Sequence, residues 1–356
     1  MLRALAWLCL LLVQPAAAAG LVLEHKELPV TIAGTATALE TLLVLPPGGP
    51  APLAILSHGT PRDGAERRRR APHALLPQAQ EFARRGWAVA IVMRRGYGTS
   101  PADYAESNGA CATPDYMNSA RASAADLRAA LAALAGDRRL DQRRLLAVGV
   151  SAGGFASLAL AAEPPPGLLG VVSFAGGRGS PRPEEVCAPD RLAAAFAALG
   201  RSARVPSLWI YAENDRYFSP ALAGAFFQAF TAAGGRAELV IAPAFGEDGH
   251  TLFSRAGIAH WTPYVERFLA RHRLTVLAEP LPLPRDQAEP PASLAEPGRK
   301  SFADYLAAPP HKAFATGSGS SYGWVSARRT REDAAREALE TCRRHSSRDC
   351  TVAHGR

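Results

Sequence analysis

Residues 149–154 (GVSAGG) combine a serine with flanking glycines in a pattern that suits nucleophilic catalysis. The segment directly follows the apolar run 145–148 and precedes an alanine-rich stretch, so we expect a strand before the serine and a helix after it. A turn this tight needs glycine beside the serine. The turn would lift the Ser151 hydroxyl to the carboxyl edge of a sheet, and the helix N-terminus would favour a developing negative charge. Ser151 is therefore the predicted nucleophile.

A catalytic serine needs a base to accept its proton and an acid to orient that base. Asp215 follows the apolar run 207–212, and His250 lies in a glycine-containing loop after the run 237–242. The order serine, aspartate, histidine along the chain is the one that a strand–turn–helix serine site uses. We therefore predict His250 as the general base and Asp215 as its orienting acid. Two other carboxylates remain alternatives for the acid, Glu213 and Asp190.

Backbone amides must also hold the negative charge that develops on a substrate oxygen. One predicted donor is the N–H of Ala152, directly after the nucleophile, and the other is that of Thr60 in the loop HGTP after the run 53–57. His58 precedes Thr60, and its position in the chain predicts a role in fixing this loop rather than a second base. The loop 94–100 (RRGYGTS) leaves another apolar run at the same edge, where it either lines the substrate pocket or forms a tight turn.

The elements that must position these residues follow a regular alternation. Between residues 21 and 273, short apolar runs alternate with alanine-rich helical stretches, which predicts an α/β fold with a mostly parallel sheet flanked by helices. The expected strands are 21–26, 37–45, 53–57, 87–92, 145–148, 168–174, 207–212 and 237–242. The expected helices are 73–85, 119–135, 152–162, 190–199, 219–233 and 262–271.

The first 19 residues have the features of a signal peptide. A basic start at Arg3 precedes an apolar stretch over 4–13 and small residues up to Ala19, where we expect cleavage. We therefore expect a secreted or periplasmic protein. No other apolar run approaches the roughly 18 residues of a transmembrane helix, so we expect no integral membrane segment in the mature chain.

Four cysteines lie beyond the predicted cleavage site, and an even number in an exported chain allows two disulfides. Proximity favours Cys342 with Cys350, which leaves Cys111 for Cys187. Zinc is the competing use of four cysteines, but none of them falls in a Cys-x-x-Cys pair, and we expect no metal.

The net charge of +8 allows nucleic acid, anionic surfaces or acidic substrates as partners. The arginines are not interleaved with stacking aromatic residues in a nucleic-acid module, so a solvated basic surface and no nucleic-acid partner are expected.

Together, the motifs at 58–61, 95–100 and 149–154, with Asp215 and His250, resemble α/β-hydrolases of the dienelactone hydrolase and prolyl-oligopeptidase-like branch. The resemblance covers residues 20–275 and implies a central sheet of about eight strands. It also implies a serine acyl-enzyme mechanism without a cofactor. True dienelactone hydrolases use cysteine as the nucleophile, so hydrolysis of carboxylic esters is the expected activity. A serine peptidase of the aminopeptidase or prolyl-oligopeptidase type is one alternative, and a non-catalytic binding protein on the same fold is another.

The composition changes over residues 276–300, which are rich in proline and suit a semi-rigid linker. Residues 301–356 follow as a small disulfide-containing domain of the α+β class. The segments KAFA at 312–315 and YGWVS at 322–326 resemble a small secreted cysteine-containing family of unknown function. That resemblance implies a short hairpin, a helix and a cysteine-bounded strand. The domain would either bind a cell-surface partner or stabilise the fold.

Overall fold

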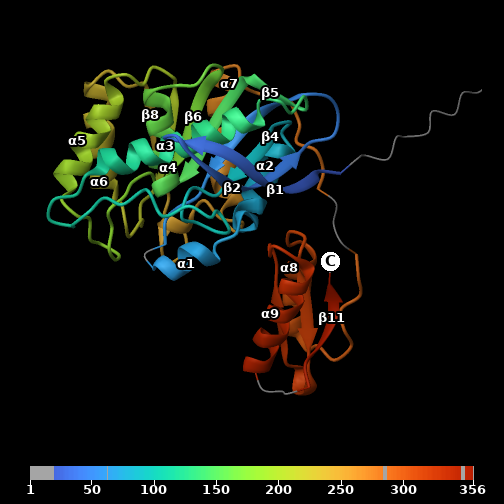
Figure 1. The fold of residues 1–356 in the computed structure, drawn as a ribbon. Helices are drawn as coiled ribbons and strands as arrows, with labels where there is room; N and C mark the ends of the chain where they lie inside the picture. The colour runs from blue at the N-terminus through green and yellow to red at the C-terminus, as the bar shows by residue number, and fades with distance from the viewer. Residues whose placement is uncertain (1–19, 62, 284–286, 346–348, 356) are drawn as a thin grey trace, which may run out of the picture.

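The computed structural model describes residues 20–355, apart from residues 62, 284–286 and 346–348 (Figure 1). The predicted signal peptide, residues 1–19, lies outside the described part of the chain. No helix among the described residues is long and apolar enough to cross a membrane.

A central sheet of eight strands runs through the larger part of the molecule, in the order β1-β2-β4-β3-β5-β6-β7-β8. The strands are β1 Val22–Ile32, β2 Thr35–Leu45, β3 Ala51–Ser57, β4 Ala88–Val92, β5 Leu140–Val150, β6 Leu168–Phe174, β7 Ser207–Ala212 and β8 Ala237–Ala242. From β4 to β8 all neighbouring strands are parallel, whereas β2 pairs antiparallel with both β1 and β4. The predicted mostly parallel sheet is confirmed.

Helices cover both faces of this sheet (Figure 1). Residues of α3 Tyr116–Leu134, α4 Ala152–Ala162, α5 Pro189–Gly200 and α6 Pro220–Ala232 share one core with the sheet, and residues of α2 Leu76–Ala83 and α7 Ile258–Arg271 share the other. Strand β3 shows why two cores form. Leu53 and Ile55 enter the first core while Ala54 and Leu56 enter the second, because successive side chains of a strand point to opposite faces.

Several elements differ from their predicted bounds. The first strand extends to Ile32, because β1 forms a long hairpin with β2 at the edge of the sheet. Helix α3 begins at Tyr116 because the side chain of Asp115 caps it by accepting a hydrogen bond from the Asn118 amide. The short helix α1 Gly64–Arg69 was not predicted, and Asp63 caps it in the same way.

A small antiparallel sheet of three strands forms the C-terminal part, in the order β10-β9-β11. Its elements are α8 Glu296–Leu306, β9 Ala313–Thr316, β10 Tyr322–Val325, α9 Arg331–Arg344 and β11 Thr351–Gly355. Ala313 and Ala315 of β9 pack with α9, whereas Phe314 packs with α8. Helix α8 therefore belongs to this small fold, although it begins inside the range that the proline content assigns to a linker.

A buried carboxylate joins the small sheet to the large one. The guanidinium of Arg329 donates to both oxygens of Glu40 in β2, at 2.7 and 2.9 Å, and also to the carbonyl of Arg70. Glu40 is fully buried and also accepts hydrogen bonds from the Thr99 amide and the His25 ring. The contact ties the C-terminal part to β2 and, through the Thr99 amide, to the loop that follows β4.

Candidate active site

Ser151 occupies the turn between β5 and α4 in a conformation that few residues other than glycine adopt, with φ 55° and ψ −121°. Its amide donates to the carbonyl of Phe174 at 2.8 Å. Its own carbonyl accepts from the amides of Phe155 and Gly177, at 3.1 and 3.2 Å. The turn is therefore fixed by β6 and by the loop that follows it, and strain of this kind concentrates at functional sites.

The glycines beside Ser151 are needed because the backbone approaches closely there. A Cβ atom on Gly153 would lie 2.1 Å from the carbonyl oxygen of Ser57, and one on Gly149 would lie 2.1 Å from the carbonyl oxygen of Gly153. Both distances are far inside van der Waals contact, so the motif GVSAGG reflects the packing of β5, α4 and the end of β3 around the turn.

Asp215 and His250 lie together at the carboxyl edge of the sheet, after β7 and β8. The imidazole Nδ1 lies 3.1 Å from each carboxylate oxygen of Asp215, whose side chain is fully buried. The amides of Tyr217 and Phe218 donate to the same carboxylate at 2.8 and 2.9 Å. A carboxylate held in this way orients the ring, so that Nδ1 donates and Nε2 is left to accept a proton.

The two alternative acids do not make this contact. Glu213 is exposed, and Asp190 lies in the first turn of α5. Asp248, two residues from the imidazole, uses its side chain to accept hydrogen bonds from the amides of His250 and Arg216 instead.

Asn214 fastens the histidine loop, a role that sequence reasoning missed. Its side-chain amide donates to the carbonyl of Gly246 at 3.0 Å, and its oxygen accepts from the amide of Phe245 at 2.8 Å. Its backbone carbonyl accepts from the amide of Gly249. The loops after β7 and β8 are thus joined directly before the short helix η2, Gly249–Thr251, that carries His250. An asparagine beside the predicted acid, in a loop, was the available clue.

The Ser151 hydroxyl lies at the same edge as His250, and in the described part of the chain no hydrogen bond joins the two side chains. In enzymes without substrate, catalytic hydrogen bonds are often long and shorten only when substrate binds.

The loop proposed to carry an oxyanion donor lies against the nucleophile. A Cβ on Gly59 would be 3.3 Å from the Cβ of Ser151. The next residue, Thr60, is partly exposed, and its hydroxyl lies 2.7 Å from the Tyr97 hydroxyl. The second predicted donor, the amide of Ala152, begins α4.

His58 is buried and fixes this loop rather than facing a substrate. Its Nδ1 donates to the carbonyl of Gly59 at 2.8 Å, and its Nε2 accepts from the amide of Arg94 at 3.2 Å. Burial, and then the nearby positive charge of Arg94, lower the pKa of His58 well below its ordinary value. The ring is therefore neutral, in agreement with the loop-fixing role expected from its chain position.

A groove of about 1150 Å³ opens at the opposite edge of the sheet, lined in part by Leu140, Pro165 and Arg128. Leu140 begins β5, and Ser151 follows the other end of that strand. An 11-residue strand spans roughly 35 Å, so this groove is remote from the candidate site.

Comparison with solved structures agrees with the topology of the sheet. An esterase of Pyrococcus furiosus superposes with a TM-score of 0.51 at 16% identity, covering 70% of this chain and 91% of that one. The chain has the α/β-hydrolase fold.

Two further solved structures match a similar share of this chain. One is a putative dienelactone hydrolase from Klebsiella pneumoniae, with a TM-score of 0.47 at 18% identity, covering 72% of this chain and 99% of that one. The other is an acylaminoacyl peptidase of Pyrococcus horikoshii, with a TM-score of 0.47 at 14% identity, covering 74% of this chain and 43% of that one. No family model matches the sequence, and no curated protein sequence matches it.

Proposed function

We propose that this chain is an exported serine hydrolase that cleaves carboxylic esters through an acyl-enzyme. The observation that carries the proposal is the contact between the buried Asp215 carboxylate and the Nδ1 of His250, at the sheet edge where the strained Ser151 turn also lies. An imidazole oriented in this way can act as a general base for a neighbouring hydroxyl.

In the proposed reaction, Nε2 of His250 takes the proton of Ser151 as the hydroxyl oxygen attacks the ester carbonyl. The amides of Ala152 and Thr60 hold the oxyanion, and Asp215 stabilises the imidazolium that forms. The imidazolium then gives its proton to the leaving alcohol as the carbon–oxygen bond breaks. A water molecule, deprotonated by His250, releases the acid and restores Ser151.

Export is supported by the cysteines. Cys111 and Cys187 form one disulfide and Cys342 and Cys350 form the other, which is the pairing that the sequence favoured. Disulfides persist mainly in oxidising compartments such as the periplasm and the extracellular space.

The test is hydrolysis of short p-nitrophenyl esters. Aminoacyl p-nitroanilides are assayed in parallel, and cleavage of these in place of the esters would identify a peptidase. We expect Ser151→Ala to abolish ester hydrolysis and to leave the melting temperature close to that of the wild type. Ser202→Ala, at an exposed serine, is the matched control and should retain full activity. Hydrolysis by folded Ser151→Ala at the wild-type rate would contradict the proposal.

A further inference from the structure

A buried cluster of charges lies beneath the loop that carries Thr60. Glu106, in the loop after β4, is fully buried, and its carboxylate accepts hydrogen bonds from Arg94, from Arg178 at 2.9 Å and from the Tyr97 hydroxyl at 3.2 Å. Arg94 and Arg178 are themselves buried. The cluster joins the loop after β4 to the loop after β6.

This cluster holds the last residue of β3 and two residues of the loop that follows it. The guanidinium of Arg94 donates to the Ser57 hydroxyl at 2.6 Å and to the His58 carbonyl at 2.9 Å. The Tyr97 hydroxyl lies 2.7 Å from that of Thr60. The conformation of this loop is thus determined by groups that all converge on one carboxylate.

The direction of the hydrogen bonds follows from the ionisation of these groups. Burial alone would raise the pKa of Glu106, but the positive charges of Arg94 and Arg178 outweigh it and lower that pKa overall. The ionised carboxylate can only accept, so Tyr97 donates to it. The Tyr97 oxygen is then left to accept the proton of the Thr60 hydroxyl.

We propose that Tyr97 and Glu106 are positioning residues for the oxyanion hole, acting on the Thr60 amide through the Thr60 hydroxyl. The inference rests on the proposed function, because it assigns a role within the same acyl-transfer site. An amide stabilises an oxyanion most effectively when it is already aimed at the position where the charge develops. Two successive hydrogen bonds, from the Thr60 hydroxyl to Tyr97 and from Tyr97 to Glu106, provide that alignment. Neither positioning residue needs to touch the substrate.

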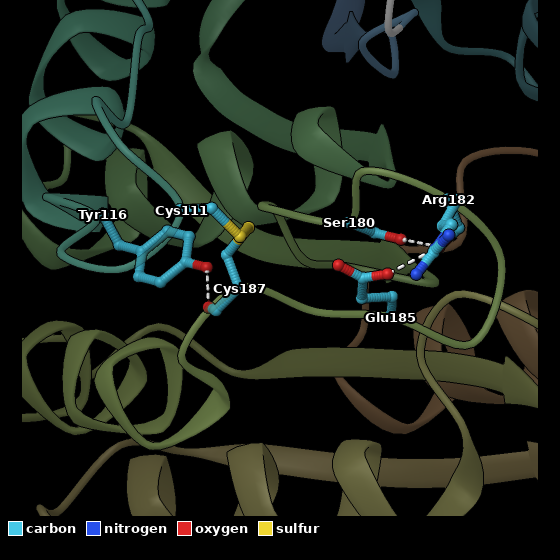
Figure 2. The surroundings of a disulfide bond; sticks show 6 residues. All are labelled: Cys111, Tyr116, Ser180, Arg182, Glu185 and Cys187. Atoms are coloured by element: carbon cyan, nitrogen blue, oxygen red, sulfur yellow. Dashed lines mark hydrogen bonds and ion pairs between the residues drawn. A yellow bond between two sulfur atoms is a disulfide. The ribbon is translucent and has the colours of Figure 1, made fainter.

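A disulfide between Cys111 and Cys187, shown in Figure 2, links the same two loops as the cluster. Cys111, on the loop that carries Glu106, is bonded to Cys187, on the loop that carries Arg178. The Cys187 amide donates to the carbonyl of Gly179, which neighbours Arg178. The covalent link and the Glu106–Arg178 ion pair therefore join the same two loops.

The substitution Glu106→Gln should change kcat in opposite directions, depending on whether Glu106 positions the loop or acts directly on the oxyanion through its charge. Removing a negative charge near a developing oxyanion would favour that anion and raise kcat if the charge acted directly. If Glu106 acts by holding the loop, the same change weakens the hold of Arg94 and Tyr97 on it and lowers kcat.

The test uses Tyr97→Phe, Thr60→Val and the double variant, with kcat, KM and the inhibition constant of a phenylboronic acid as readouts. The boronate forms a tetrahedral adduct at the serine and so measures the oxyanion hole directly. One neutral hydrogen bond is worth about 1 kcal/mol, so each single variant should lower kcat about fivefold to tenfold and raise the boronate constant equally. KM should change less than about twofold, since the lost interaction acts in the transition state.

The double variant should be no worse than the poorer single variant, because both substitutions remove the same hydrogen bond. Tyr104→Phe is the matched control. Its hydroxyl also contacts the buried cluster, where it accepts from Arg178 at 2.9 Å and donates to the Glu106 carbonyl at 3.1 Å, but it makes no hydrogen bond to the described residues of the loop that carries Thr60. It should lower the melting temperature without a matching change in the boronate constant.

Three outcomes would overturn the inference: an unchanged boronate constant in Tyr97→Phe, an equal change in Tyr104→Phe, or multiplicative effects in the double variant. Should Tyr97→Phe fail to fold, Thr60→Val alone decides, because Thr60 is partly exposed and valine has nearly the same shape. A wild-type protein that neither hydrolyses esters nor binds the boronate would instead contradict the proposed function, and with it this inference.

Discussion

The Nδ1 atom of His250 lies 3.1 Å from each of the two carboxylate oxygens of Asp215. If Asp215 selects the imidazole tautomer, Asp215→Asn keeps the shape but presents a donor and favours the wrong tautomer. We expect kcat for ester hydrolysis to fall about 10³-fold to 10⁴-fold, with the fold intact by circular dichroism. Glu213→Gln, at the exposed carboxylate two residues earlier, is the control and should stay within about twofold of the wild type.

Two glycines in helices offer a matched pair for testing the packing of the serine turn. Gly153→Ala would place a Cβ 2.1 Å from the Ser57 carbonyl oxygen, and we expect it to lower the free energy of unfolding by about 3 kcal/mol. Gly224 in α6 has nothing within 4 Å of its added Cβ, so Gly224→Ala should raise that free energy by about 0.5–1 kcal/mol. Urea denaturation measures both values, and equal effects in the two variants would show that this packing account is wrong.

The two disulfides should contribute unequally to stability. Cys111 and Cys187 are 76 residues apart, whereas Cys342 and Cys350 are 8 apart, and a longer loop restricts the unfolded chain more when it is closed. We expect the Cys111→Ser and Cys187→Ser double variant to lose about 4 kcal/mol, and the Cys342→Ser and Cys350→Ser double variant about 2 kcal/mol. Denaturant titration of the two double variants measures these losses. A larger loss in the Cys342→Ser and Cys350→Ser variant would contradict the loop-length argument.

His73 should make stability depend on pH. Its ring is buried between those of His25 and His311, near Glu40 and Arg329, and burial, followed by the two histidines, lowers its pKa from 6.5 to about 4. Between those values the unfolded chain binds a proton that the native state excludes. Stability is therefore fully present above pH 6.5 and falls as the pH drops toward 4.

The expected loss from pH 6.5 to pH 5 is about 1.6 kcal/mol, because the slope rises from about half of 1.4 kcal/mol per pH unit at pH 6.5 to nearly all of it at pH 5. Chemical denaturation at the two pH values measures it. His73→Phe should flatten this dependence, whereas His260→Gln, at an exposed histidine, should leave it unchanged. An identical pH slope in His73→Phe and the wild type would exclude His73 as its source.

The predictable part of the fold came from buried parallel strands. β6, β7 and β8 match their predicted ranges residue for residue. For β6 and β7 the reason is that a strand covered on both faces forms a continuous apolar run with clear ends, whereas β8 lies at the edge of the sheet and is only partly buried. Strand β1 was predicted too short, since its exposed and buried residues alternate without a sharp boundary. Asp215 and His250 could be proposed because each follows a recognisable strand.

The buried charges could not be predicted in the same way. Glu106 and Arg178 are 72 residues apart in loops without periodicity, and only the folded chain brings them together. Arg329 and Glu40, which join the small sheet to the large one, are 289 residues apart. A charged residue in a loop is normally solvated, so nothing local distinguishes Glu106, Arg178 and Arg329 from exposed residues. Glu40 is the one charged residue of β2, and the partner that explains it lies far along the chain.

Covalent labelling with a serine-reactive probe shows whether Ser151 is a catalytic nucleophile. The wild type, Ser151→Ala and Asp215→Asn would be treated with a fluorophosphonate probe, digested, and mapped by mass spectrometry. We expect a single phosphonylated peptide containing Ser151 in the wild type, slower labelling of Asp215→Asn, and no labelling of Ser151→Ala. A folded wild-type protein that takes up no label, or a label on a serine other than Ser151, would contradict that role.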